Sequence, residues 1–214
     1  MISYNGNIIS SNGIWMYALP SIGNGAIRCK FKYGYVPDSD NYISMVRISD
    51  NPNIWDLTPY TGYWTMLFDN NEYLLEVLDV NLQENFSLTG IFANTPNLTY
   101  ANLSKCTGNI GINNGFDGSG VQYVVLNSNP EFNSIHLFED CYNLKDLNNI
   151  KFTGEPFGAE TMFQGCVNVE SGILDLYNRL IALGKGPYGA MFRDCGINTE
   201  TGRAELEQIP SDWK

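Results

Sequence analysis

The sequence has little charge, and most of that charge is negative. Charged residues make up 16% of the 214 positions, and 23 Asp and Glu stand against 12 Lys and Arg, giving a formal net charge of −11. A surface that binds phosphate groups needs clustered Lys and Arg. The nearest cluster is Arg28, Lys30 and Lys32, which alternate along one predicted strand. We therefore expect no nucleic-acid partner.

Long apolar runs are also missing. No stretch approaches the roughly 18–20 apolar residues of a membrane-spanning helix. Residues 1–20 lack the charged segment followed by an apolar segment that marks a secretory signal. We therefore expect a chain that is made in the cytoplasm, carries no signal peptide and does not insert into a membrane.

Residue types that carry chemistry are sparse. The single histidine, His136, would have to serve any Ser-His-Asp or Cys-His mechanism, and no nucleophile motif lies near it. An odd number of cysteines without a Cys-x-x-Cys pair indicates neither a disulfide framework nor a zinc site. We expect no catalytic, cofactor-binding or metal-binding residue and no enzymatic activity. The five cysteines are Cys29, Cys106, Cys141, Cys166 and Cys195.

Two acidic loops leave calcium binding open. One contains Asp38 and Asp40, and the other contains Asp117. Both offer oxygen ligands, but neither completes a twelve-residue EF-hand loop that ends in Glu. Ordinary turns explain both segments as well. The many carboxylates also leave a two-carboxylate glycan-active enzyme as a further hypothesis, although a short repeat body offers no obvious cleft for such a pair.

Asparagine and glycine are abundant, with 26 Asn and 21 Gly, while apolar residues make up 43% and aromatic residues 13% of the chain. The apolar content indicates a folded protein. Asn and Gly both tolerate left-handed backbone angles and are therefore typical of turns. This composition argues against a helical bundle and predicts short strands joined by many tight turns.

The first 62 residues predict a small all-β unit. Asn5-Gly6 and Asn12-Gly13 are strong hairpin signals. Further along, Ile27, Cys29 and Phe31 alternate with basic residues, which is the period-two pattern of a half-buried strand.

From residue 63 onward the chain repeats itself. Phenylalanines recur at spacings of 24, 24, 22, 25 and 29 residues, a Cys follows each of the last three by three positions, and an apolar residue often follows by six. We expect these positions to point inward and to line up between successive repeats. The predicted repeat core consists of Phe68, Phe92, Phe116, Phe138, Cys141, Leu144, Phe163, Cys166, Phe192 and Cys195.

The repeats and the C-terminal sequence together predict a β-rich α/β solenoid over residues 63–214, with coils of about 22–29 residues. Ile173, Leu176, Leu180 and Leu183 have helical spacing, with Ser171 as the expected N-cap. A second short helix is expected between Arg203 and Ile209. These helices would cap the terminal coil, which otherwise exposes its core on one side.

The repeat unit resembles the BspA-like leucine-rich repeat, most clearly over residues 137–147 and 162–169. The chain is also similar to repeat proteins of Bacteroides phages, including crAss-like phages. The matching pieces are 1–7, 27–31, 53–56 and 198–210. This resemblance implies leucine-rich-repeat coils and a virion-associated or surface-associated binding protein without catalysis.

On this basis we expect a structural or binding protein of a phage virion, in a head or tail appendage. Its partners would be other virion proteins, a host cell-surface protein or a glycan, and the chain would form a homo-oligomer. The N-terminal unit would attach it to the particle or drive self-association. The alternative is a bacterial leucine-rich-repeat module for protein interaction or surface adhesion. The sequence does not identify the interaction surface.

Overall fold

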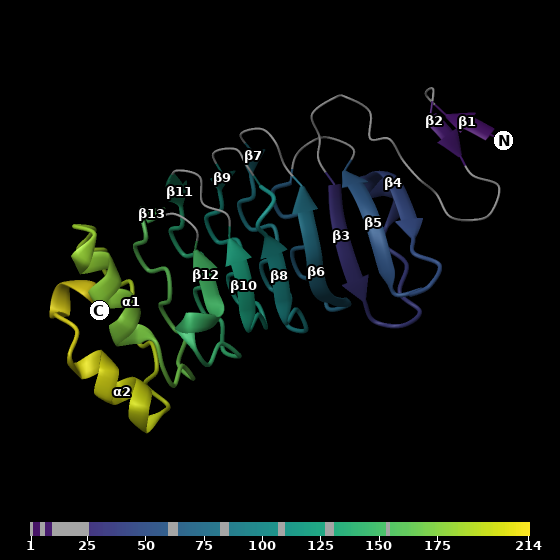
Figure 1. The fold of residues 1–214 in the computed structure, drawn as a ribbon. Helices are drawn as coiled ribbons and strands as arrows, with labels where there is room; N and C mark the ends of the chain where they lie inside the picture. The colour runs from purple at the N-terminus through teal and green to yellow at the C-terminus, as the bar shows by residue number, and fades with distance from the viewer. Residues whose placement is uncertain are drawn as a thin grey trace.

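The main element of the fold is a seven-stranded mixed sheet (Figure 1). The computed structural model describes residues 2–4, 7–9, 26–59, 64–81, 86–106, 110–126, 131–152 and 155–214. The strand order is β12-β10-β8-β6-β3-β5-β4. Four parallel strands come from the repeats, namely β6 (Leu74–Asn81), β8 (Tyr100–Leu103), β10 (Tyr123–Leu126) and β12 (Ile150–Phe152). Three antiparallel strands come from the N-terminal part, namely β3 (Ala26–Phe31), β5 (Ile54–Pro59) and β4 (Tyr42–Arg47).

The repeats also contribute a second, four-stranded parallel sheet in the order β13-β11-β9-β7. Its strands are β7 (Phe86–Ser87), β9 (Ile110–Gly111), β11 (Glu131–Asn133) and β13 (Glu155–Phe157). Each repeat therefore alternates between a strand of one sheet and a strand of the other. Three short 3₁₀ helices complete the connections, namely η1 (Ser39–Asn41), η2 (Leu147–Asn149) and η3 (Ser211–Trp213).

The N-terminal strand pattern is confirmed. Ile27, Cys29 and Phe31 on β3 are fully buried, whereas Arg28 between them is exposed. β1 (Ile2–Tyr4) and β2 (Asn7–Ile9) pair antiparallel, as the Asn5-Gly6 signal predicts. The Asn12-Gly13 signal lies outside the described residues. Because β3 pairs with β6, one sheet crosses the expected boundary between residues 62 and 63, and the division into two domains stays a prediction.

The predicted α/β solenoid of leucine-rich-repeat coils is wrong. The described residues form an open, seven-stranded mixed sheet with only two α-helices, α1 (Ile173–Ala182) and α2 (Glu200–Glu207), and β12 and β4 are the two edges of that sheet. The repeat spacing correctly indicates which residues recur. It contains no information about the antiparallel N-terminal strands, which join the same sheet through pairing between residues far apart in the sequence.

The phenylalanines of the repeat occupy turns rather than strands. We call the five residues centred on each of these six phenylalanines a Phe turn. The residue two positions before each Phe has φ between 55° and 61°, and the residue two positions after has φ between 51° and 72°. Such left-handed angles favour Gly and Asn, which accounts for part of the Asn and Gly content. The twelve positions are Met66, Asn70, Gly90, Asn94, Asn114, Gly118, His136, Asp140, Thr161, Gly165, Ala190 and Asp194.

Backbone hydrogen bonds join each Phe turn to the next. The Phe N–H donates to the carbonyl of the residue that precedes the following Phe, as from Phe68 to Ile91 at 2.9 Å and from Phe138 to Met162 at 2.9 Å. The rings of successive turns stack with centroids 5.2–6.1 Å apart. Together the turns form a continuous aromatic column inside the protein.

The two predicted C-terminal helices are present. α1 begins after Gly172 rather than after Ser171, and the Glu205 carboxylate accepts a hydrogen bond at 3.0 Å from the N–H of Leu174 in the first turn of α1. Thr199 caps α2, which starts earlier than expected, by accepting a hydrogen bond from the N–H of Gly202. An acceptor at a helix N-terminus satisfies an N–H that has no partner within the helix, so Glu205 of α2 stabilises the start of α1 and Thr199 stabilises the start of α2.

Candidate functional site

All ten residues of the predicted repeat core are buried. Phe68 is 1% exposed, and the other nine are fully buried. The Cys166 thiol donates to the Phe138 carbonyl at 2.9 Å, and the Cys141 thiol donates to the Phe116 carbonyl at 3.1 Å. Burial raises the pKa of the Cys166 thiol well above its ordinary value. A nucleophilic cysteine needs a lowered pKa and access to solvent, so these thiols act as core residues.

His136 lies on the surface of a Phe turn. Its Nδ1 is 2.5 Å from a Glu139 carboxylate oxygen and 2.8 Å from the Thr161 hydroxyl. Both contacts are to the same ring nitrogen. A catalytic triad places its acid and its nucleophile on opposite nitrogens of the imidazole. This arrangement therefore links two neighbouring Phe turns and does not activate the Thr161 hydroxyl.

The two acidic loops are built as ordinary turns. Asp38 accepts hydrogen bonds from the Asp40 N–H at 2.9 Å and from the Asn41 amide at 3.0 Å, which makes it the cap of η1. Asp117 accepts a hydrogen bond from the Asn114 amide at 3.3 Å. Within the described residues, no group of three or more His, Cys, Asp and Glu side chains is arranged to hold a metal ion.

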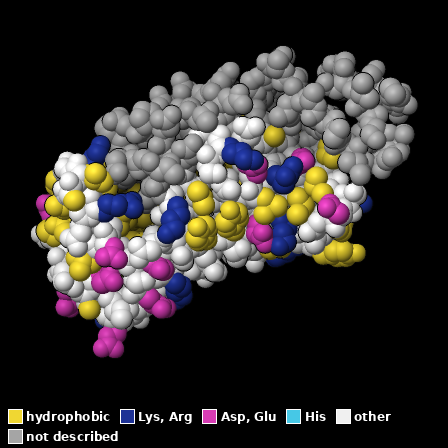
Figure 2. Space-filling model, in the orientation of Figure 1, with side chains coloured by type: hydrophobic (Ala, Val, Ile, Leu, Met, Phe, Trp, Pro, Cys, Tyr) yellow, Lys and Arg dark blue, Asp and Glu magenta, His cyan; other side chains and the backbone are white. Residues whose placement is uncertain are grey.

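The seven-stranded sheet has an outer face opposite the Phe column. On β8 and β10, Ala101, Leu103, Val124 and Leu126 are buried, so the alternate residues Tyr100, Asn102, Tyr123 and Val125 point outward. Figure 2 shows hydrophobic side chains gathered over the middle of this face, with Lys and Arg on both sides. The rings of Tyr100 and Tyr123 stack 5.7 Å apart with an interplanar angle of 12°.

Ion pairs flank the tyrosines on the side of the N-terminal strands. Lys30 pairs with Glu76 at 2.5 Å, and Glu76 lies next to Tyr100 in the register of the sheet. Arg28 pairs with Asp56 at 2.7 Å, and this hydrogen bond raises the pKa of the guanidinium. Pairs as exposed as these contribute only about 0–1 kcal/mol to stability. They fix the orientation of charged side chains around the tyrosines.

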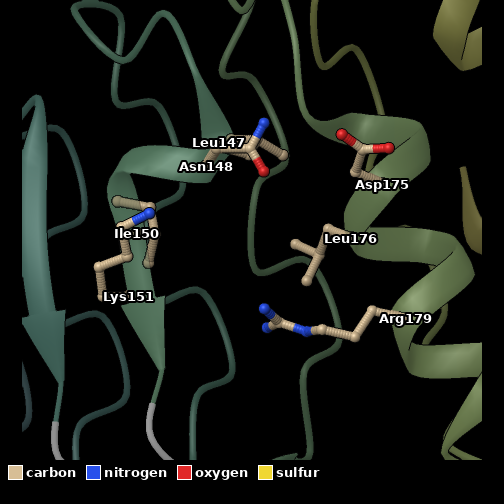
Figure 3. Close-up of a pocket in the computed structure, with 7 residues that line it drawn as sticks. All are labelled: Leu147, Asn148, Ile150, Lys151, Asp175, Leu176 and Arg179. Carbon is tan, nitrogen blue, oxygen red and sulfur yellow. The ribbon is translucent and has the colours of Figure 1, made fainter.

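A cavity of about 190 Å³ lies at the other end of this face, between β12 and α1 (Figure 3). Leu147, Ile150 and Leu176, which line it, are at most 6% exposed. The remaining lining residues are polar or charged and more exposed, namely Asn148, Lys151, Asp175 and Arg179. Leu176 and Arg179 point from α1 toward the strand in Figure 3.

The sequence prediction did not identify the outer tyrosines or the cavity. Tyr100 and Tyr123 each stand three residues before a leucine, Leu103 and Leu126, so period-two alternation counted from these leucines could have placed both tyrosines on one face. The cavity has no comparable signal, because it forms between residues 147–151 and 175–179 through the packing of a helix against a strand.

Comparison with known proteins found no matching family model, no matching curated protein and no matching solved structure. The resemblance to BspA-like repeats and to phage repeat proteins stays a prediction. In the part of the chain that the structure describes, no helix is long and apolar enough to cross a membrane.

Proposed function

We propose that the chain is a non-catalytic binding protein and that the outer face of its seven-stranded sheet is the contact surface. The stacked pair Tyr100 and Tyr123 carries this proposal. Tyrosine is enriched in protein interfaces because its ring offers a large apolar area and its hydroxyl can form hydrogen bonds.

The surroundings of the two tyrosines fit the same proposal. A typical interface has an apolar centre and a polar rim. Val125 extends the apolar centre along β10, and Asn102 adds an amide beside it. The pairs of Lys30 with Glu76 and Arg28 with Asp56 form one side of the rim, and Lys151 on β12 lies on the other side.

We place this binding protein in a phage virion, as a structural component of a head or tail appendage. The resemblance of the sequence to repeat proteins of Bacteroides phages supports this placement. The partner of the outer face would then be another virion protein or a host cell-surface protein or glycan, and the chain would act as a homo-oligomer.

Mass spectrometry of density-purified phage particles, released from cells that carry the gene, tests the placement. We expect the chain at a constant ratio to the capsid protein across the particle peak. Its absence from the peak would contradict the virion placement and favour the bacterial interaction module.

The contact surface is tested in the same particles. The variant Y100A/Y123A should be lost from the particles or should abolish their attachment to host cells. The matched control is Y142A, because Tyr142 is 52% exposed and lies outside the outer face. Particle content and attachment equal to wild type in Y100A/Y123A would contradict the assignment of the outer face.

A further inference from the structure

The outer face of the seven-stranded sheet has opposite charges one strand away on either side of its apolar centre. Tyr100 and Tyr123 lie side by side on the neighbouring strands β8 and β10. Glu76 on β6 lies one strand beyond Tyr100, and Lys151 on β12 lies one strand beyond Tyr123. An acidic side chain and a basic side chain therefore flank the tyrosine pair from opposite sides.

The two charged residues differ in how they are held within the chain. Glu76 accepts a hydrogen bond from Lys30 at 2.5 Å, and its side chain is 30% exposed. A carboxylate accepts several hydrogen bonds, so Glu76 can hold a second cation at the same time. Lys151 is exposed and forms no ion pair with any residue that the structure describes. The Lys151 ammonium is therefore available to a carboxylate outside the chain.

This arrangement makes the outer face complementary to a second copy of itself. Homo-oligomers most often have a twofold axis, and the same surface of each copy then forms the interface. A twofold axis that lies in the interface, parallel to the strands and between β8 and β10, exchanges the two sides of the face. It places Tyr100 of one copy over Tyr123 of the other and brings Lys151 of one copy over β6 of the other, the strand that carries Glu76.

Charge selects this axis over a twofold axis perpendicular to the strands. The perpendicular axis returns each strand to its own position, so the Lys151 side chains of both copies would lie on facing β12 strands. With the axis along the strands, Lys151 stands two residues beyond the row that contains Tyr100, Tyr123 and Glu76. Two residues of a strand span about 7 Å, which the long Lys side chain covers. Packing of two sheets with nearly aligned strands is also the arrangement of many β-sandwiches.

We infer that two copies of the chain pack through their outer faces about the twofold axis parallel to the strands. The four tyrosines, Tyr100 and Tyr123 of each copy, form the centre of the interface. Lys151 of each copy pairs with Glu76 of the other, which gives two symmetric ion pairs at the rim. The inference rests on the proposed function, because it names a second copy as the partner of the surface assigned there.

Sedimentation velocity of the full chain over a range of concentrations measures the association. We expect wild type to reach the mass of two chains, and we expect K151E and E76K each to raise the dissociation constant at least about tenfold. Either variant places like charges together at both symmetric positions of the dimer. The matched control R193E makes the same charge change as K151E at an exposed position in the last Phe turn, away from the outer face, and should leave the constant unchanged. A wild-type chain that stays monomeric would overturn the inference.

Mixing the K151E and E76K chains tests the twofold axis itself. In a mixed dimer the two exchanged charges face each other, and the second ion pair is that of wild type. The mixture should therefore dimerise about as strongly as wild type, although each variant alone does not. Such recovery requires that both variants are folded. A mixture that associates as weakly as its two components would overturn the inference.

Failure of the interface and failure of the proposed function give different results. A monomeric wild type, together with loss of Y100A/Y123A from the particles, would overturn the twofold interface and leave the outer face as the contact surface for a different partner. A wild-type dimer with the expected charge dependence, in a chain that is absent from the particles, would support the interface and contradict the virion placement.

Discussion

The backbone N–H of Phe192 donates to the carbonyl of Trp213 at 2.9 Å. In every earlier Phe turn, the Phe N–H donates to the carbonyl of the residue that precedes the next Phe. Trp213 therefore stands where a seventh Phe turn would begin. Its ring also lies 6.3 Å from the Phe192 ring at an angle of 19°, so it closes the aromatic column as well as the hydrogen-bond ladder.

Replacing this cap should strongly destabilise the protein. Trp213 is 2% exposed, and Tyr177 and Tyr188 pack edge-on against it. We expect W213A to lower the free energy of unfolding by about 3–5 kcal/mol, the range for large aromatic side chains in a core, measured by urea denaturation. The matched control I181A removes an exposed side chain from α1 and should change stability by less than about 0.5 kcal/mol. A similar small loss in W213A would contradict the capping role.

The cysteines should not react with thiol reagents in the folded protein. All five are buried, and burial raises the pKa of the Cys29, Cys166 and Cys195 thiols. Ellman's reagent at pH 8 should therefore release almost no colour from the native protein within minutes and should titrate five thiols in guanidinium chloride. Rapid reaction of a native thiol would contradict its placement in the core.

The raised pKa of the Asp117 carboxyl predicts that the stability of the protein depends on pH through this residue. Burial raises the pKa of its carboxyl; the Asn114 amide opposes this, and the charges of Asp140 and Asp69 add to it. Because the folded state then holds this proton more tightly than the unfolded chain, ionisation of Asp117 disfavours folding. The penalty is absent below the ordinary pKa of Asp and is complete above the raised value.

The variant D117N should therefore have a higher Tm than wild type at pH 7, and the difference should shrink toward zero near pH 3. Thermal unfolding across this pH range measures it. The control D50N removes the same charge from an exposed turn, and its effect on Tm reports the general influence of net charge. A difference for D117N that does not exceed the one for D50N at pH 7 would contradict the prediction.

Substitution by glycine should have opposite effects on stability at Ala190 and at Ala204. Ala190 has φ 56° in the last Phe turn, whereas Ala204 lies within α2. A left-handed angle costs a residue with a Cβ about 1–2 kcal/mol, and glycine loses about 0.5–1 kcal/mol in backbone entropy. We expect A190G to raise the free energy of unfolding by up to about 1 kcal/mol and A204G to lower it by a similar amount. Urea denaturation of both variants measures the two changes, and the same sign in both would contradict the assigned backbone geometry.

The sequence predicted correctly those elements whose pattern lies within a few neighbouring residues. The alternation of Ile27, Cys29 and Phe31 gave β3, and the spacing of Ile173, Leu176 and Leu180 gave α1. The repeat register gave the buried phenylalanines, because each sits at the same place in a turn of the same geometry.

Pairing over long distances was not predictable in the same way. Alternation shows that one side of β3 is buried, but it does not show that Cys29 lies opposite Val77 of β6 and Trp55 of β5. For this reason the sequence predicted a solenoid instead of the open, seven-stranded mixed sheet. The cavity between β12 and α1 could not be predicted for a related reason, because it forms where a helix packs beside a strand far away in the sequence.

The ladder of the Phe turns has a further electrostatic consequence. Its N–H groups point toward the C-terminal end of the protein and its carbonyl groups point back, as in the bonds from His136, Phe138 and Asp140 to the following turn. Aligned peptide dipoles add, and in an α-helix their sum equals about half an elementary charge at each end. Here the positive pole lies at the C-terminal end, the reverse of a helix. The segment after Phe192 carries four exposed carboxylates, and a positive pole favours negative charge beside it: Asp194, Glu200, Glu207 and Asp212.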